Sequence, residues 1–203
     1  MKINQFVILA LLISVISCKK EESSYTEVSG IVYEQGTNNT KTVANALVEL
    51  QWRIPKTYGA EVYHLDSTRT DENGRFTLSA DAPDANLHVF ASGHHYYPGG
   101  ELTMDANVKR GRSQTLNLDL IPYTWLRMHI TKTGQYHNLG IGSPLGSTRT
   151  YSITTDTTII SNPVLGNTEV ELDLFKYKNG LQEREQVTVQ TIGHDTVDIA
   201  IEF

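Results

Sequence analysis

The sequence predicts an all-β protein, in which a seven-stranded β-sandwich is followed by a second, smaller β-sandwich domain. From residue 25 onward, apolar and polar residues alternate with a period of two in almost every apolar segment. No segment has its apolar residues at helical spacing. Turn-forming Gly, Pro, Asn and Asp residues separate these segments. At 203 residues, the chain is long enough for two small domains or for one large β-sandwich, and either would bury its own core.

The first half of the chain shows this alternation most clearly. Two turns are predicted to close hairpins: the segment 71–74, and the basic turn of Lys109, Arg110 and Arg112 around Gly111, which would join 101–108 to 113–120. The residues predicted to point inward are Val28, Gly30 and Val32; Ala46, Val48, Leu50 and Trp52; Phe76 and Leu78; Leu87, Val89 and Ala91; and Leu116, Leu118 and Leu120.

Pro122 interrupts the pattern, because proline cannot donate a hydrogen bond to a central ladder. This predicts domains at 26–121 and 122–203. If Ile31, Tyr33, Leu47 and Phe90 lie on one sheet face, we expect them to form the contact between the domains. Turns of the second half are expected at Gly134, 140–146, 162–163, 166–167, 179–180 and Gly193. Its predicted inward residues are Leu126, Met128 and Ile130; Tyr151 and Ile153; Val170, Leu172 and Leu174; Val187 and Val189; and Val197, Ile199, Ile201 and Phe203.

The N-terminal segment has the composition of an export signal. Lys2 precedes an apolar run over 6–13 that is too short to span a bilayer, and the run ends in Val15-Ile16-Ser17-Cys18. These four residues resemble the lipobox of bacterial lipoproteins, although the first is Val where Leu is commoner. The resemblance implies that residues 1–17 are a cleaved signal peptide and that Cys18 carries a thioether-linked diacylglycerol and an amide-linked acyl chain such as palmitate. An ordinary signal peptide with an incidental Cys is the alternative.

Polar residues follow Cys18 directly, so 18–25 is expected to be the lipidated Cys and its tether. A Lys-plus-acidic run of this kind resembles the signal that sends envelope lipoproteins to the outer face of the outer membrane. The chain is therefore expected to be anchored in the outer membrane through its N-terminal lipid and exposed at the cell surface, with the periplasmic face as the alternative.

Charge and cysteine content exclude several functions. The net charge of −6 repels phosphate backbones, so no nucleic acid partner is expected. The single Cys is Cys18, directly after the leader, which leaves no Cys for a disulfide or a Cys-based zinc site in the folded part.

Four segments of the first half, taken in order, resemble the carboxypeptidase regulatory-like, transthyretin-like domain family. They are Val28-Ser29-Gly30-Ile31-Val32, Ala46-Leu47-Val48-Glu49-Leu50, Thr70-Asp71-Glu72-Asn73-Gly74-Arg75-Phe76, and Ala91-Ser92-Gly93 before aromatic residues. The resemblance covers about residues 26–120, and the Thr-Asp-x-x-Gly-x-Phe segment is its most specific part. It implies a prealbumin-like sandwich, but not a chemistry, because members occur in peptidases, transporters and surface lipoproteins.

No catalytic or metal-binding residues and no cofactor are predicted. His94, His95, Tyr96 and Tyr97 carry iron-binding groups, but neighbouring strand residues point to opposite faces. The C-terminus lacks the Tyr-Arg-Gly-Ser of the transthyretin-related hydroxyisourate hydrolases, no Gly-x-Ser-x-Gly elbow is present, and the other His residues have no ligand spacing. Asp71 and Asn73 fit a turn better than a calcium loop. A hydrolase or metal-dependent enzyme is the least favoured alternative.

The expected function is therefore a non-enzymatic binding or assembly module of the cell envelope, with an outer-membrane protein as its partner. The alternative is a carbohydrate-binding surface lipoprotein, because sugar rings stack on exposed aromatic rings and the chain has 10 Tyr and 2 Trp. Alternation places Trp52 inward and Trp125 outward. The candidate ligand-contact residues are Trp125, Tyr96, Tyr97 and Phe90.

Overall fold

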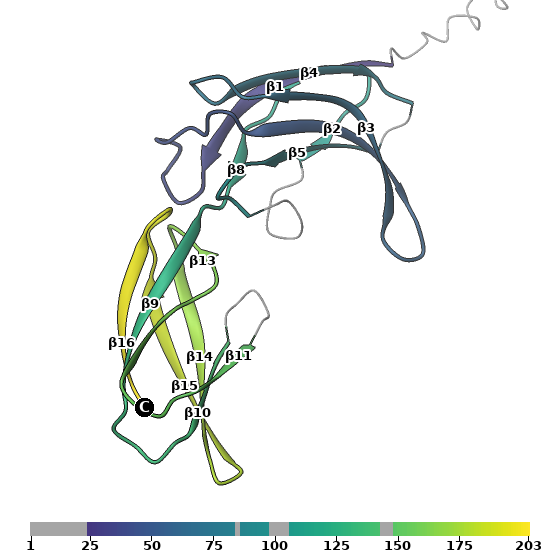
Figure 1. Cartoon of the computed structure of the whole chain (residues 1–203). Helices are drawn as coiled ribbons and strands as arrows, with labels where there is room; N and C mark the ends of the chain where they lie inside the picture. Colours follow the sequence, from purple (N-terminus) through teal and green to yellow (C-terminus); the bar gives the residue numbers. More distant parts are fainter. Residues whose placement is uncertain (1–23, 84–85, 98–105, 143–147) are drawn as a thin grey trace, which may run out of the picture.

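The computed structural model describes residues 24–83, 86–97, 106–142 and 148–203, which form sixteen β-strands (Figure 1). The all-β prediction is confirmed. None of the described residues belongs to a helix long and apolar enough to cross a membrane. Cys18, the leader and most of the predicted tether lie outside the described residues.

Strands β1 to β8 form a first β-sandwich. One sheet has the order β4-β1-β7, with β8 also paired to β1, and the other has the order β3-β2-β5-β6. β7 and β8 both run parallel to β1. The strands are β1 (Tyr25–Glu34), β2 (Leu47–Pro55), β3 (Ala60–Arg69), β4 (Arg75–Asp81), β5 (Leu87–Ser92), β6 (Ala106–Val108), β7 (Ser113–Thr115) and β8 (Leu118–Leu120).

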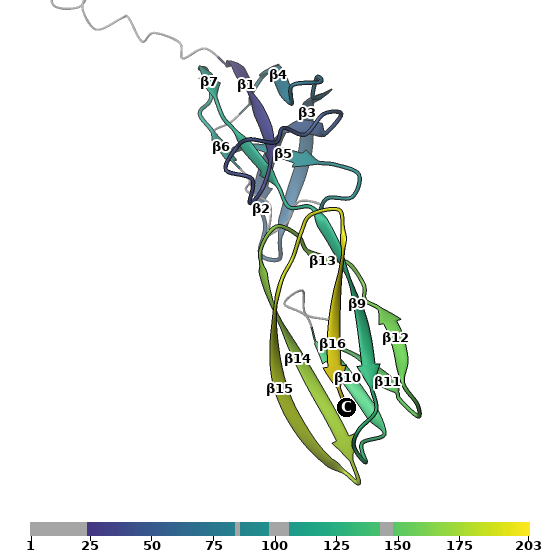
Figure 2. The same ribbon diagram turned by 90° about the vertical axis from the view of Figure 1, so that its left-hand side faces the viewer.

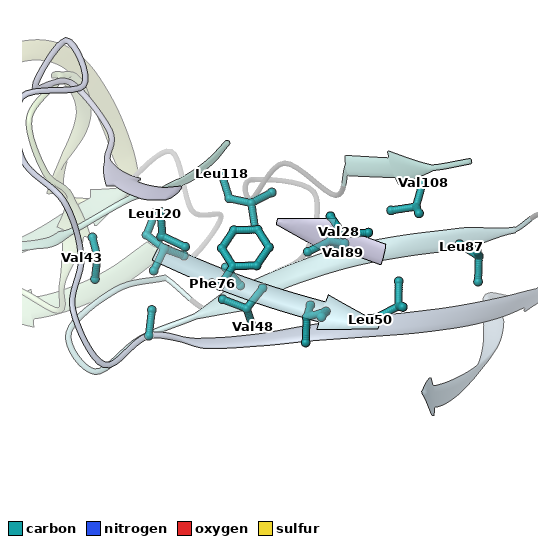
Figure 3. Close-up of a cluster of buried hydrophobic side chains, with 14 of the residues drawn as sticks. Val28, Val43, Val48, Leu50, Phe76, Leu87, Val89, Val108, Leu118 and Leu120 are labelled. Carbon is teal, nitrogen blue, oxygen red and sulfur yellow. The ribbon is translucent and has the colours of Figure 1, made fainter. Parts of the chain in front are cut away.

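The core of the first sandwich is made by the alternating apolar residues of both sheets. Val28, Val48 and Val89 are fully buried, and Phe76 lies among them between the two sheets (Figure 3). The predicted inward residues are confirmed here, although Trp52 and Leu116 are only partly buried against this core. Period-two alternation identified the core because successive strand side chains point to opposite faces.

Both predicted hairpins of the first sandwich are wrong. The Asp71 turn forms as expected: its carboxylate Oδ1 accepts hydrogen bonds from the backbone N–H groups of Asn73 and Arg75, both at 2.8 Å, and Gly74 has a left-handed φ of 73°. The turn joins strands of different sheets, however, because β3 pairs with β2 and β4 pairs with β1. Likewise β6 pairs with β5, whereas β7 pairs with β1. Turn residues specify a chain reversal, but the packing of the two sheets selects the partner strand.

Strands β9 to β16 form the second sandwich. One sheet has the order β11-β10-β14-β15, and in the other β9 pairs with β12, β13 and, in parallel, β16. The strands are β9 (Tyr123–Thr131), β10 (Asn138–Gly142), β11 (Thr148–Ser152), β12 (Thr157–Ile160), β13 (Val164–Leu165), β14 (Glu169–Lys178), β15 (Leu181–Gln190) and β16 (Thr196–Glu202).

The second sandwich has its own core, which contains most of the residues predicted to point inward. Leu126 and Met128 from β9 meet Leu172 and Leu174 from β14, and all are at most 1% exposed. The turn expected at 140–146 begins later than predicted, because Gly140 lies inside β10, paired with Thr150 and Phe175, and residues 143–146 lie outside the described residues. A Cβ on Gly140 would lie 3.2 Å from the Cβ of Phe175. Because glycine has no Cβ, the Phe175 side chain can lie directly against β10 at this position.

The two sandwiches meet end to end, where β8 leads into β9. In Figure 1 the strands of the first sandwich run across the view and those of the second run down it, and Figure 2 shows the same junction from the side. The predicted contact through a sheet face is wrong. Ile31 and Tyr33 lie in the sheet of β1, whereas Leu47 and Phe90 lie in the opposite sheet, so these residues do not share a face. Loops at the sandwich ends make the contact.

Candidate functional site

A buried carboxylate lies at the junction of the two sandwiches. Glu34 is the last residue of β1, and its side chain is only 2% exposed. Glu34 occupies an inward-pointing position of β1, like Val28 and Val32, so the alternation of the strand directs an acidic group into the interior. A buried carboxylate requires hydrogen-bond donors to replace water.

Both sandwiches supply donors to Glu34. From the first, Lys41 Nζ lies 2.9 Å from Oε1 and 2.8 Å from Oε2, and the Tyr96 hydroxyl donates to Oε2 at 2.9 Å. From the second, Asn167 Nδ2 donates to Oε1 at 2.9 Å, and His194 Nε2 lies 2.9 Å from Oε2. We call these five residues the Glu34 network. Each carboxylate oxygen is therefore shared between the two sandwiches.

Loops of unusual backbone conformation place the two donors from the second sandwich. Asn167 and His194 have positive φ values of 55° and 63°. Asn167 follows β13, and its Oδ1 accepts a hydrogen bond from the backbone N–H of Gly193 at 2.7 Å. Its Nδ2 also donates to the Gln35 carbonyl at 3.0 Å. One amide side chain thus holds together the two loops of the second sandwich and the end of β1.

The donors set the protonation of Glu34. Burial raises the pKa of its carboxyl, but the hydrogen bonds from Lys41, Asn167, Tyr96 and His194 outweigh burial, so that the pKa lies below its ordinary value of 4.5. Burial, together with the hydrogen bond to Glu34, raises the pKa of the Tyr96 hydroxyl far above its usual range. Glu34 is therefore ionised and Tyr96 is a neutral donor over a wide pH range.

Backbone hydrogen bonds reinforce the junction. The N–H of Tyr97 donates to the Ile121 carbonyl at 2.9 Å, the N–H of Tyr123 donates to the His95 carbonyl at 2.8 Å, and the N–H of His194 donates to the Tyr123 carbonyl at 2.7 Å. These hydrogen bonds connect the start of β9 to the loop after β5 and to the loop before β16. Because these bonds are short and numerous, the segment between the sandwiches is part of a packed interface.

Aromatic rings pack beside the network. Tyr97 meets Tyr123 with centroids 4.6 Å apart, Tyr123 lies 6.3 Å from Trp125, and His95 lies 6.1 Å from Trp125, all edge to face. The Tyr96 ring also packs edge to face on His194, at 4.8 Å. The Tyr97 hydroxyl is buried, finds no hydrogen-bond partner among the described residues, and has a pKa raised well above its usual range by burial.

The structure thus brings together three of the four predicted ligand-contact residues. Tyr96 belongs to the Glu34 network, and Tyr97 and Trp125 belong to the aromatic group at the same junction. Phe90 lies apart on β5, half-buried, where it pairs with Glu49. Ligand contact by these four residues stays a prediction.

The histidines gather into no metal site in the part of the chain that the structure describes, where no three His, Cys, Asp or Glu residues converge. His94 and His95 lie on an exposed turn, with their rings edge to face at 3.8 Å. His129 forms a separate surface group in which Nε2 lies 2.7 Å from Asp198 and Nδ1 lies 3.2 Å from the hydroxyl of Thr158.

The Glu34 network itself escaped sequence reasoning. One signal was present, since Glu34 falls in the inward phase of an otherwise apolar strand. Asn167 and His194 carried weaker signals, because each follows a Gly and was visible only as a turn residue. Nothing in the local sequence connects these three positions.

Comparisons with known proteins give only distant structural similarity. No family model and no curated protein matches the chain. Among solved structures, it is similar to the Bacillus anthracis TIE protein, with 12% identity, a TM-score of 0.35, and coverage of 88% of this chain and 34% of that one. A streptococcal ancillary pilin has 12% identity, a TM-score of 0.43, and coverage of 88% and 62%.

The C-terminal fragment of the pilus adhesin SpaC from Lactobacillus rhamnosus GG is also similar, with 9% identity, a TM-score of 0.23, and coverage of 86% of this chain and 96% of the fragment. This chain therefore spans about a third of the TIE protein and less than two thirds of the pilin.

Proposed function

We propose that this chain is a lipid-anchored protein of the outer membrane that presents its second sandwich, without catalysis, for binding or assembly with another envelope protein. The observation that carries the proposal is the Glu34 network, in which the buried carboxylate binds two donors from each sandwich. A protein that presents a surface at a distance from its anchor needs a joint of this kind.

The network favours one relative orientation of the sandwiches. Moving the second sandwich away would withdraw Asn167 and His194 and leave Glu34 with Lys41 and Tyr96 as its remaining donors. A hydrogen bond to a charged group contributes about 1.5–3 kcal/mol. The joint is therefore stiff, and the second sandwich keeps a defined direction from the first.

The direction of β1 supports a role in presentation. This strand begins at Tyr25, next to the predicted tether, and ends at Glu34 in the junction. If Cys18 carries the lipid, the first sandwich separates the anchor from the second sandwich by the length of this strand. The second sandwich is then the part best placed to meet a partner.

We further propose that the first sandwich belongs to the carboxypeptidase regulatory-like family, whose most specific segment in this sequence begins with the buried Thr70. Its hydroxyl donates to the Val43 carbonyl at 2.7 Å and accepts from the N–H of Ala46 at 2.9 Å, just before the Asp71 turn. The most specific part of the sequence resemblance thus has a structural task, which is to hold the start of β2 against the end of β3.

Mild crosslinking in intact cells tests the assembly role. We expect a membrane protein to copurify with the wild-type chain and with Glu171→Ala, which removes an exposed carboxylate of β14. We expect the same protein to be lost from Glu34→Ala, because the second sandwich is no longer held in place. Mass spectrometry of the purified chain tests acylation of Cys18. Absence of any specific partner across growth conditions would overturn the assembly role.

Glycan binding is the second candidate, and the aromatic group of Tyr97, Tyr123, Trp125 and His95 at the junction favours it. A glycan array probed with the full chain tests it. Binding that is lost in Trp125→Ala and retained in Tyr58→Ala, an aromatic residue 94% exposed elsewhere in the fold, would establish it. An array on which no glycan binds the chain would refute glycan binding.

A further inference from the structure

We propose that the end of the first sandwich where β1 begins docks on an anionic lipid surface, through the tip of the β2–β3 hairpin and the basic β6–β7 turn. This inference rests on the proposed lipid anchor at Cys18. We call this end the membrane-facing end and define it by Tyr58, Lys109 and Arg112. The position, the shape and the charge of this end favour a bilayer surface as its occupant.

The basic turn lies beside the point where the chain enters the fold. The N–H of Gly111, at the centre of the turn, donates to the Thr26 hydroxyl at 2.9 Å. The N–H of Ala82 donates to the Ser24 carbonyl at 2.9 Å, and Arg110 Nε donates to the Ala82 carbonyl at 2.8 Å. The start of β1 and the 109–112 turn therefore occupy the same end of the sandwich.

The β2–β3 hairpin projects from this end. Trp52 is the last residue of β2 that pairs with β5, and it stacks on Tyr63 of β3 with centroids 5.0 Å apart. Beyond this pair, the hairpin runs on to a turn closed by the N–H of Lys56 and the Gly59 carbonyl, 3.0 Å apart. Figure 1 shows the start of β1 and the base of the hairpin on the side of the molecule away from the second sandwich, and from there the hairpin bends downward to its tip.

An exposed tyrosine occupies the hairpin tip. Tyr58 is 94% exposed, so the fold leaves almost the whole ring in solvent. Tyrosine is favoured at membrane interfaces, because its ring lies among the headgroups and its hydroxyl remains hydrated. A projecting hairpin with such a residue at its tip has a shape suited to shallow insertion.

Unpaired basic groups accompany Tyr58. The side chains of Lys109 and Arg112 form no hydrogen bond or ion pair with the described part of the chain, whereas two of the acidic groups at this end are engaged: Glu61 binds Lys56 at 3.0 Å, and Asp81 accepts from Ser24 at 3.0 Å. In a chain of net charge −6, two cations beside the chain entry that have no acidic partner among the described residues attract an anionic surface.

The tether limits the distance between this end and the bilayer. Seven residues from Cys18 to Tyr25 extend at most about 25 Å, at roughly 3.3–3.6 Å per residue. An anchor on a tether this short raises the effective concentration of the membrane-facing end at the bilayer, so that weak contacts by one Tyr and two cations are sufficient for docking.

Fluorescence quenching in vesicles tests the proposal. Full-length protein with Thr57→Cys carries one thiol besides Cys18, and a fluorophore on it reports from the hairpin tip while Tyr58 is retained. Leu181→Cys, 73% exposed at the β14–β15 turn, is the matched control on the second sandwich. We expect doxyl-labelled lipids in anionic vesicles to quench the probe at 57 and to leave the probe at 181 unquenched.

Three further comparisons identify the cause. With the probe at 57, quenching should fall with Tyr58→Ala, with Lys109→Glu plus Arg112→Glu, and in purely zwitterionic vesicles, but not with Lys178→Glu near the far turn. Equal quenching at 57 and 181, or no quenching at 57 in protein that stays with the vesicles, would overturn the docking inference alone. Protein that washes off the vesicles would overturn the anchor, and the docking inference with it.

Discussion

The carboxylate of Glu34 in the first sandwich lies 2.9 Å from Nε2 of His194 in the second, although 160 residues separate them in the sequence. Because Glu34 is 2% exposed and the His194 side chain 29% exposed, the pair closes the junction from its solvent side. The stiffness of the joint depends on this contact and on the three other donors to Glu34.

Substitutions of Glu34 measure the strength of the network. Glu34→Gln places an amide N–H₂ group among donors, and we expect it to lower the free energy of unfolding by about 1–3 kcal/mol. Glu34→Ala leaves four donors around a cavity, and we expect a loss of about 3–5 kcal/mol. Urea denaturation checks both values. Glu171→Gln, on an exposed carboxylate, should change stability by less than about 0.5 kcal/mol; equal effects at positions 34 and 171 would refute the network.

The pH dependence of stability follows from the direction of the Glu34 shift. Burial raises the pKa of this carboxyl, but its hydrogen bonds lower the pKa by more than burial raises it. The folded pKa therefore lies below the ordinary 4.5. A carboxyl with a lowered pKa stabilises the folded state above its unfolded pKa, and the stabilisation is lost as pH falls through the folded pKa. We expect wild-type stability to fall below pH 4.5 more steeply than that of Glu34→Gln. Parallel curves in urea titrations would contradict this assignment.

Gly36 permits the close approach of the two sandwiches. Its φ is +81°, and a Cβ there would lie 2.5 Å from the carbonyl oxygen of Asn167. Gly36→Ala should therefore lower the free energy of unfolding by about 1–3 kcal/mol more than backbone strain alone. Gly180→Ala is the matched control, because Gly180 has φ +80° and no atom of the described residues lies within 4 Å of the added Cβ. Equal losses in thermal unfolding would show that the interdomain contact contributes nothing.

Core substitutions test whether the sandwiches unfold together. Leu50 is fully buried in the first core, and Leu172 is 1% exposed in the second. Leu50→Ala and Leu172→Ala should each cost about 2–5 kcal/mol. If the Glu34 network couples the sandwiches, each variant shifts one common transition in calorimetry, and combination with Glu34→Ala separates two transitions. Two transitions in the wild type would show that the junction is weak.

Much of the fold was accessible from the sequence because burial in a sandwich repeats every second residue. Val28, Val48 and Leu172 were assigned inward and are buried. The local geometry of the Asp71 turn was equally readable, since it depends only on neighbouring backbone groups. The candidate ligand residues Tyr97 and Trp125 both proved to pack on Tyr123, although nothing in their spacing had indicated it.

The sequence by itself determined the period of alternation, the inward residues and the places where the chain turns, because these follow from short-range stereochemistry. Only the tertiary structure decided which strands pair, as the misassigned β3–β4 and β6–β7 hairpins show. It also decided that Glu34, Asn167 and His194 meet. The physical reason is that strand partners and buried polar contacts depend on distances between segments far apart in the chain, which no local pattern encodes.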